Sequence, residues 1–207
     1  MRSNMMLLMA AAIWGLGFVA QRLGMDHMGP FTFNGLRFLL GALSLLPLLW
    51  WLKSRQPKPQ PGSPSGDRRL LLVGGLIAGG VLFSAASLQQ VGLLYTTAAK
   101  AGFITGLYII LVPVIGLALR HKTGANTWVG ALIAMAGLYY LSVTEEFTIG
   151  YGDLLQVIGA LFWAIHLLVL DHYSNRVAPI RLAGVQFVVC GLLSLGTAFV
   201  IETPTLG

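Results

Sequence analysis

Long apolar stretches separated by short polar ones dominate this chain. They approach about 20 residues, the length that an α-helix needs to cross about 30 Å of hydrocarbon. Backbone groups in lipid must form their hydrogen bonds within their own segment, so we expect helices. The pattern predicts seven membrane-spanning helices, at roughly 4–21, 31–52, 70–91, 94–119, 126–143, 153–170 and 182–201.

The joints between these stretches carry residues that end helices. Gly29-Pro30 and Pro179 interrupt the pattern, and residues 53–69 form the longest joint. This joint is rich in proline, glycine and charge, so we interpret it as a solvated linker without a core. Pro113 predicts an interruption of the fourth helix, which could serve as a hinge or be an ordinary proline of a membrane helix.

Small residues four positions apart predict faces on which membrane helices pack closely. Ala11-x-x-x-Gly15 and Gly75-x-x-x-Gly79 have this spacing. We therefore expect close helix contacts on the first and third helices.

The composition agrees with a polytopic membrane protein and excludes an ordinary soluble domain. Of 207 residues, 56% are hydrophobic and only 10% are charged, against about 25% charged residues in soluble domains. The net charge of +6 does not indicate nucleic-acid binding, because the basic residues lie between apolar stretches. The lone Cys190 excludes an internal disulfide. Metal-ligand spacing and nucleophile–base pairs are absent from the sequence, so we expect neither an enzyme nor a cofactor.

Basic residues are unevenly distributed between the predicted helices. If the N-terminus is cytoplasmic, Arg22 is the basic residue of the outer loops, and ten basic residues lie on the inner side. Basic residues collect on the cytoplasmic side of membrane proteins. We therefore expect a multi-pass protein of the plasma or inner membrane with a cytoplasmic N-terminus. The inner residues are Arg2, Lys53, Arg55, Lys58, Arg68, Arg69, Arg120, Lys122, Arg176 and Arg181.

An internal repeat relates residues 11–46 to residues 160–195 at a fixed offset of 149 positions. Five predicted helices separate the two starts, and an odd number turns the second copy upside down in the membrane. Inverted repeats are a recurring construction of secondary transporters, with the substrate site between the halves. We expect a first five-helix repeat at 1–145 and the start of a second at 146–207, cut short with about three helices missing. Matching positions include Trp14 and Trp163, Pro30 and Pro179, Gly35 and Gly184, and Phe38 and Phe187.

Three motifs, "AAAIWGLGFVAQRLG", "GPFTFNGLRFLLGAL" and "YTTAAKAGFITGLYIILVPVIG", resemble the EamA type of the drug/metabolite transporter superfamily. The resemblance implies an all-α polytopic membrane protein of ten helices, seven of them visible here, in two inverted five-helix repeats. It also implies a central cavity that opens alternately to each side, and export of amino acids, other metabolites or drugs. The chain departs from the family at "LALRHKTGANTW", where the acidic residue of a Gly-Glu-Arg-like turn is missing.

Lys100 lies inside the predicted helix 94–119, about 9–12 Å below its outer edge at 1.5 Å per residue. An ionised side chain in the centre of a membrane helix costs about 3 kcal/mol. Three explanations remain open. The long side chain could reach the outer headgroups, the amine could face a cavity and hold an anionic solute, or it could pair with a carboxylate from the missing helices.

Arg37 lies seven residues after Pro30, at a similar depth of about 10 Å. Two positive charges at one depth repel each other, so we expect an anionic ligand or an acid from the missing helices to neutralise them. The alternative for Arg37 is an anchor at the helix end or a bond to backbone carbonyls.

Five further residues are candidates for a substrate site within the membrane. His166 could carry protons, since histidine has a pKa of about 6.5, or could be a hydrogen-bonded packing residue. Gln89 could meet headgroups or line a cavity, and Gln186 occupies the repeat position of Arg37. Trp14 and Trp163 lie deep in their helices, where they could pack across the repeat axis or stack on a substrate.

Two hypotheses for function follow. The first is a secondary carrier that exports a small organic solute, with Lys100 and Arg37 selecting an anionic or zwitterionic one. The second is a membrane scaffold without transport, or a truncated remnant of a carrier. The expected partners are a small-molecule substrate and the lipid bilayer, not nucleic acid, and a homodimer is left open.

Overall fold

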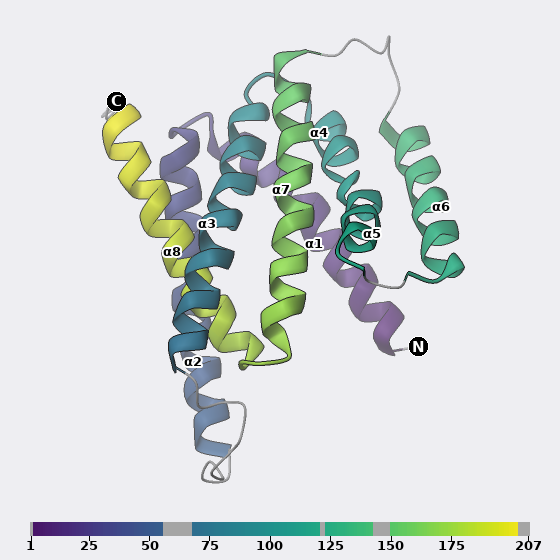
Figure 1. Ribbon diagram of the computed structural model, residues 1–207. Coiled ribbons are helices and arrows are strands. Elements are labelled where there is room, and N and C mark those ends of the chain that lie inside the picture. The colour runs from purple at the N-terminus through teal and green to yellow at the C-terminus, as the bar shows by residue number, and fades with distance from the viewer. Residues whose placement is uncertain (1, 56–67, 121–122, 143–149, 203–207) are drawn as a thin grey trace.

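The computed structural model describes residues 2–55, 68–120, 123–142 and 150–202, and these residues form α-helices joined by short turns (Figure 1). The predicted all-α class is confirmed. The predicted fourth helix consists of two shorter helices, α4 and α5. The helices are α1 (Arg2–Gly24), α2 (Pro30–Arg55), α3 (Arg68–Gly92), α4 (Ala98–Thr105), α5 (Tyr108–Ala118), α6 (Ala125–Ser142), α7 (Tyr151–Ser174) and α8 (Pro179–Ile201).

Five segments of the described residues are long and apolar enough to cross a membrane. They are α2, α3, α4 with α5, α7 and α8, while α1 and α6 contain the shorter apolar stretches Leu8–Gly24 and Ala125–Gly137. Large apolar side chains point outward, with Phe199 92% exposed and Val200 81% exposed. Hydrocarbon would cover such a surface, and water would not. The chain is therefore a multi-pass membrane protein.

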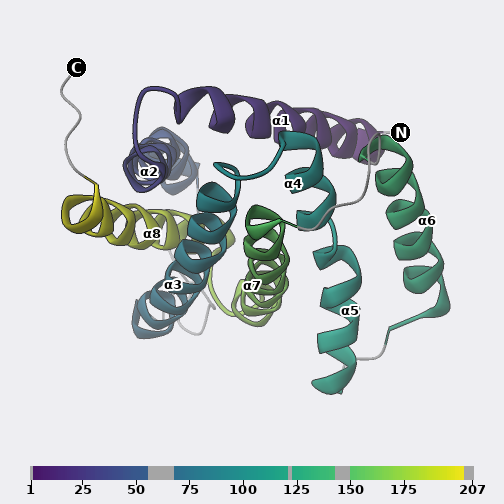
Figure 2. The same cartoon turned by 90° about the horizontal axis from the view of Figure 1, so that it is seen from above.

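Helix α3 lies at the centre of the bundle, against α7 and α8, and α2 packs along α8 (Figure 2). The predicted close-packing face of α3 is confirmed: a Cβ built on Gly79 would lie 2.6 Å from Cβ of Val189. Gly74 is equally tight, because its Cβ would lie 2.7 Å from the Tyr173 ring. The expected face on α1 is wrong for the described residues, since none of the other helices places an atom within 4 Å of a Cβ built on Gly15.

Matching helices of the two sequence blocks run in opposite directions. Helix α1 ascends in Figure 1 while α7 descends, and α2 descends while α8 ascends. The α1–α2 turn and the α7–α8 turn consequently lie at opposite ends of the bundle. We call the end with the α1–α2 turn the outer end, following the predicted orientation.

The fourth crossing begins four residues later than predicted. Residues 93–95 form a turn, and Thr97 caps the helix by accepting a hydrogen bond from the Lys100 backbone N–H at 3.2 Å. Lys100 therefore lies in the first turn of α4, about 3–5 Å from the helix end. The predicted depth was wrong because residues 94–97, which precede α4, were assigned to the helix.

The same crossing is interrupted at Gly106 and Leu107, and not at Pro113 as predicted. Gly106 and Leu107 form a turn between α4 and α5, whereas Pro113 lies within α5. Short-range backbone hydrogen bonds, such as the one from Ile109 N to the Gly106 carbonyl at 3.0 Å, replace the regular α-helical bonds across this turn. This break places the start of α5 beside the centre of the bundle.

Lys100 pairs with an acidic residue of this chain. Its Nζ lies 2.7 Å from Oδ2 of Asp153, which is only 3% exposed. The Asp153 carboxylate also accepts hydrogen bonds from Thr96 Oγ1 at 2.5 Å and Gly150 N at 2.9 Å. The acid that pairs with Lys100 is therefore one of this sequence and not one supplied from elsewhere, and a role of Lys100 in holding a solute stays a prediction. The pair joins the outer ends of α4 and α7.

A second carboxylate ties α2 to α8 at the outer end. Glu202 follows α8 and accepts hydrogen bonds from Phe31 N at 2.6 Å, Thr32 N at 3.1 Å and Thr32 Oγ1 at 2.5 Å. The first N–H groups of a helix have no partner within it, so an anionic acceptor stabilises this end.

We predict that Asp153→Asn lowers the free energy of unfolding by about 2 kcal/mol, because the Lys100 ammonium keeps its charge and loses its anionic partner. The effect stays below that of a fully buried pair, since 33% of the Lys100 side chain is exposed. Thermal unfolding in detergent measures it, with the exposed Asp171→Asn as control. Adding Lys100→Gln should restore part of the loss, and strictly additive effects would contradict the pairing.

We predict that Glu202→Ala lowers the free energy of unfolding by about 1–2 kcal/mol, because it removes the acceptor for three donors of α2. Glu202→Gln keeps one acceptor oxygen and should lose about half as much. The same thermal measurement tests both variants. Equal stability of wild type and Glu202→Ala would show that the cap does not hold α2 against α8.

Candidate functional site

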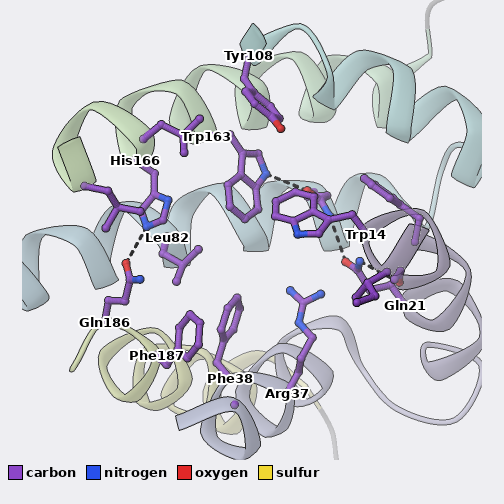
Figure 3. Close-up of a pocket in the computed structure, with 17 residues that line it drawn as sticks. Trp14, Gln21, Arg37, Phe38, Leu82, Tyr108, Trp163, His166, Gln186 and Phe187 are labelled. Carbon is purple, nitrogen blue, oxygen red and sulfur yellow. Dashed lines mark hydrogen bonds between the residues drawn. The ribbon is translucent and has the colours of Figure 1, made fainter. Parts of the chain in front are cut away.

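A cavity of about 600 Å³ lies between α1, α2, α3, α5, α7 and α8 (Figure 3). Small-molecule sites commonly have volumes of about 300–1,000 Å³. The walls are mainly aromatic and aliphatic, with a few polar groups. Its lining residues are Ile13, Trp14, Gly17, Phe18, Gln21, Arg37, Phe38, Gly41, Leu82, Gln89, Tyr108, Trp163, His166, Leu167, Leu170, Gln186 and Phe187.

Two aromatic pairs bring together residues from matching positions of the two sequence blocks. The rings of Trp14 and Trp163 meet edge to face at 5.9 Å between centroids. The rings of Phe38 and Phe187 lie 5.7 Å apart in a tilted arrangement. Each residue of a pair lies 149 positions from its partner. Aromatic rings in such contacts stabilise packing and leave the rest of their surface to the cavity.

Arg37 is the charged residue among the described cavity-lining residues. Its Nη2 donates to Asn34 Oδ1 at 2.9 Å, and its guanidinium lies 4.7 Å from the centroid of the Phe38 ring. Asn34, fully buried, donates through Nδ2 to the Ala86 carbonyl of α3 at 3.1 Å. Asn34 thus connects the guanidinium to α3, while the buried Nε of Arg37 has no hydrogen-bond partner among the residues that the structure describes.

His166 and Gln186 form a second polar pair in the wall, nearer the inner end. Nε2 of His166 lies 2.8 Å from Oε1 of Gln186, and the imidazole is only 5% exposed. The imidazole also meets the Trp163 ring edge to face at 5.9 Å. His166 lies eight residues before the end of α7 at Ser174, a distance of about 12 Å along the helix. A hydrogen-bonded packing role and a proton-carrying role remain open for it.

Gln89 connects the cavity wall to two other helices. Trp163 Nε1 donates to Gln89 Oε1 at 2.8 Å, and Gln89 Nε2 donates to Gln21 Oε1 at 3.1 Å. Gln21 Nε2 donates in turn to the Gly17 carbonyl at 3.0 Å. These bonds join α7, α3 and α1 along one side of the cavity (Figure 3).

The structure brings six of the seven predicted site residues to this cavity: Trp14, Arg37, Gln89, Trp163, His166 and Gln186. Lys100 is absent from the lining, since its ammonium pairs with Asp153. Whether the six bind a solute remains a prediction.

The sequence analysis missed Gln21 and Asn34. Residues three or seven positions apart lie on the same face of a helix. Gln21 follows Trp14 by seven positions, and Asn34 precedes Arg37 by three. This spacing was the signal that could have identified both residues.

The cavity has the chemistry of a binding site. Its described lining combines one guanidinium, three carboxamides, one imidazole and six phenyl, phenol or indole rings, and contains no carboxylate. In the described ranges, no group of three or more His, Cys, Asp or Glu side chains could hold a metal ion. A small solute with an apolar body and an anionic group would match these walls.

Comparison with known proteins identifies the family. The sequence profile of the EamA-like transporter family matches residues 1–143. An uncharacterised transporter of Archaeoglobus fulgidus is 34% identical over 202 residues, which are 96% of this chain and 58% of that protein. The uncharacterised transporter YetK of Bacillus subtilis is 29% identical over 210 residues, 95% of this chain and 62% of YetK.

The uncharacterised inner membrane transporter YedA of Escherichia coli K12 is 27% identical over 201 residues, 94% of this chain and 60% of YedA. The chain thus spans about three fifths of the length of these curated relatives. No solved structure matches the chain significantly. On the profile match and the similarity to the archaeal protein, the chain belongs to the EamA-like transporter family.

Proposed function

We propose that this chain works as a secondary membrane carrier of small organic metabolites, such as amino acids or related solutes. The solute would bind in the central cavity and leave it by alternating access, in the direction of export. The carrier would lie in the plasma or inner membrane with a cytoplasmic N-terminus, as the distribution of basic residues predicts. The observation that carries the proposal is the aromatic cavity with Arg37 as its charged lining residue.

The environment of Arg37 favours an anionic or zwitterionic solute. A guanidinium has five N–H donors, and the described hydrogen bond to Asn34 uses one of them. No described carboxylate lines the cavity to neutralise the charge. A carboxylate or similar group of a solute could accept two parallel hydrogen bonds from such a fork.

The aromatic walls favour a solute with an apolar or aromatic body. Trp14, Trp163, Phe38 and Phe187 surround the space beside Arg37 (Figure 3). Rings of this kind bind apolar groups through area removed from water and through stacking. Binding energy would then come from the body of the solute, and selectivity for charge from the guanidinium.

The inverted arrangement of the two blocks supports alternating access. Helices α1 and α7 run in opposite directions, as do α2 and α8. Two positions that a two-fold axis relates can touch only close to that axis. Trp14 touches Trp163 and Phe38 touches Phe187, so these contacts support an axis at the cavity. A cavity on such an axis can open to either side by rocking one block against the other. The ten-helix, two-repeat architecture is part of this proposal.

We predict that Arg37→Gln weakens binding of the preferred solute at least about tenfold, because a hydrogen bond to a charged group contributes about 1.5–3 kcal/mol. Arg37→Lys should keep part of the affinity, since the charge remains and the planar fork is lost. The solute is first found with a thermal-shift panel of amino acids, organic acids and organic cations on the full chain, and then tested in proteoliposomes. Arg176→Gln, an exposed arginine in the α7–α8 turn, is the matched control.

Two outcomes of this experiment would contradict the proposal. Preference for organic cations, or equal affinity of wild type and Arg37→Gln for an anion, would remove Arg37 from solute selection. A wild-type chain that inserts correctly and neither binds nor moves any member of the panel would favour a scaffold without transport.

A further inference from the structure

Two carboxamides meet at the outer end of the cavity. Gln21 lies three residues before the end of α1, and Gln89 lies three residues before the end of α3. Their side chains are 6% and 4% exposed, and Gln89 Nε2 donates to Gln21 Oε1 at 3.1 Å. Both line the cavity. The pair therefore lies between the cavity and the outer side of the bundle.

The indole of Trp163 fixes the orientation of both carboxamides. An indole N–H can only donate, so the Gln89 atom that faces it must be the oxygen. The Gln89 nitrogen then faces Gln21 and must meet its oxygen, which leaves the Gln21 nitrogen to donate to the Gly17 carbonyl. Every donor in this series meets an acceptor only if the hydrogen bonds run from Trp163 through Gln89 and Gln21 to Gly17.

Further hydrogen bonds hold the same end of the bundle. Gln156 Nε2 of α7 donates to the Gln89 backbone carbonyl at 2.9 Å. Nη1 of Arg22 donates to the backbone carbonyl of Leu93, which is fully buried just after α3. Helix α1 is thus joined to α3 through two consecutive residues in its last turns, at Gln21 and Arg22. In hydrocarbon such bonds are not replaced by water.

The opposite half of α1 is differently placed. Its large side chains near the amino end are exposed, with Met6 at 70% and Leu8 at 67%. Both views show the amino end of α1 far from α2 and α8, whereas its carboxyl end lies beside α2 (Figures 1 and 2). The described hydrogen bonds from α1 to α3 and to the turn after it therefore lie at the outer end, and α1 diverges from α2 towards the inner end.

We propose that Gln21 and Gln89 form the outer gate of this cavity, and that Trp163 links the gate to the bound solute. This proposal rests on the carrier function proposed above. A solute that stacks on Trp163 and shifts the indole withdraws the N–H that orients Gln89. The Gln89–Gln21 bond then loses its fixed geometry, and the outer ends of α1 and α3 separate more readily. Solute binding would in this way favour opening at the outer end.

The size of the effect follows from the population of the open state. Removing one hydrogen bond of ordinary strength shifts an equilibrium about fivefold. Gln89→Met removes both side-chain bonds and keeps a similar volume, so it should raise the open population at least about fivefold. Trp163→Phe removes the indole N–H and keeps an aromatic wall, so it should have a smaller effect in the same direction.

Cysteine accessibility tests the gate without requiring a known solute. The single native cysteine, Cys190, is buried and is first replaced by Ala. Leu167→Cys then serves as reporter, because Leu167 lines the cavity and makes none of the gate bonds. The rate at which a membrane-impermeant methanethiosulfonate reagent labels this cysteine in right-side-out spheroplasts measures access from outside. The full chain is used throughout, and each variant is checked for insertion and for a single peak in size-exclusion chromatography.

We expect Gln21→Met, Gln89→Met and Trp163→Phe to raise the labelling rate from outside, by about fivefold for Gln89→Met. Gln186→Met is the matched control, because it makes the same chemical change in the same cavity, away from the gate. It should leave the outside rate unchanged. Unchanged rates in all three gate variants, or an equal rise in Gln186→Met, would overturn the proposal.

A double variant tests the gate even if the single variants unfold. Gln21→Cys with Gln89→Cys, cross-linked by a bifunctional methanethiosulfonate, should lower later labelling of the Leu167→Cys reporter. A parallel sample that carries the reporter without the two gate cysteines receives the same reagent and corrects for reporter thiol that the cross-linker itself consumes. Unchanged labelling of the cross-linked protein would overturn the gate. Both readouts concern access and not transport, so they stand if the carrier function fails, and failure of the gate leaves solute binding at Arg37 untouched.

Discussion

Polar side chains within a membrane protein must find hydrogen-bond partners inside the bundle, because hydrocarbon offers none. This constraint determines how the helices meet around the cavity. The Gln89 side chain bonds to α7 and α1, and its backbone carbonyl accepts a bond from Gln156, which is fully buried. Gln156 Oε1 in turn accepts a bond from Thr105 of α4 at 3.3 Å. Sliding any one of these helices by a turn would leave several buried amide groups without partners, so their register is fixed by a few polar residues.

The two sequence blocks share one tryptophan and one phenylalanine that line the cavity and differ in the polar residues around them. Arg37 of the first block corresponds to Gln186 of the second, and Gly17 corresponds to His166. The cavity therefore has the Arg37 guanidinium, bonded to Asn34, at one depth in the membrane. It has the His166 imidazole, bonded to Gln186, at another depth. Two identical halves would hold a solute equally well in either orientation. The observed halves would hold an anionic solute with its charge towards α2, so the chemical difference gives the cavity a direction that the backbone arrangement lacks.

Hydropathy and breaker residues were sufficient to predict the all-helical class and the approximate bounds of the helices outside the fourth one, because length and apolarity are required of every membrane helix. They failed where apolar residues lie in a turn. Leu94 and Tyr95 were assigned to the fourth helix on their hydrophobicity, but they lie in the turn before α4. The capping residue Thr97 was the better signal for the start of α4. The break at Gly106 lacks a proline, and the sequence pattern offers no comparable signal for it.

The two intramembrane cations show why the site was only partly predictable. Lys100 and Arg37 have the same charge and similar expected depths, and sequence spacing assigned them the same role. The difference lies in a contact between residues 53 positions apart: Asp153 begins α7 beside the start of α4 and neutralises Lys100. No described acid reaches Arg37, whose neighbours are a carboxamide and an aromatic ring. A charge that is paired within the protein stabilises one arrangement of helices. A charge without such a partner is neutralised only when an anionic solute occupies the cavity. Because the second condition depends on the solute, binding in the proposed carrier would change the relative stability of the open and closed states through Arg37.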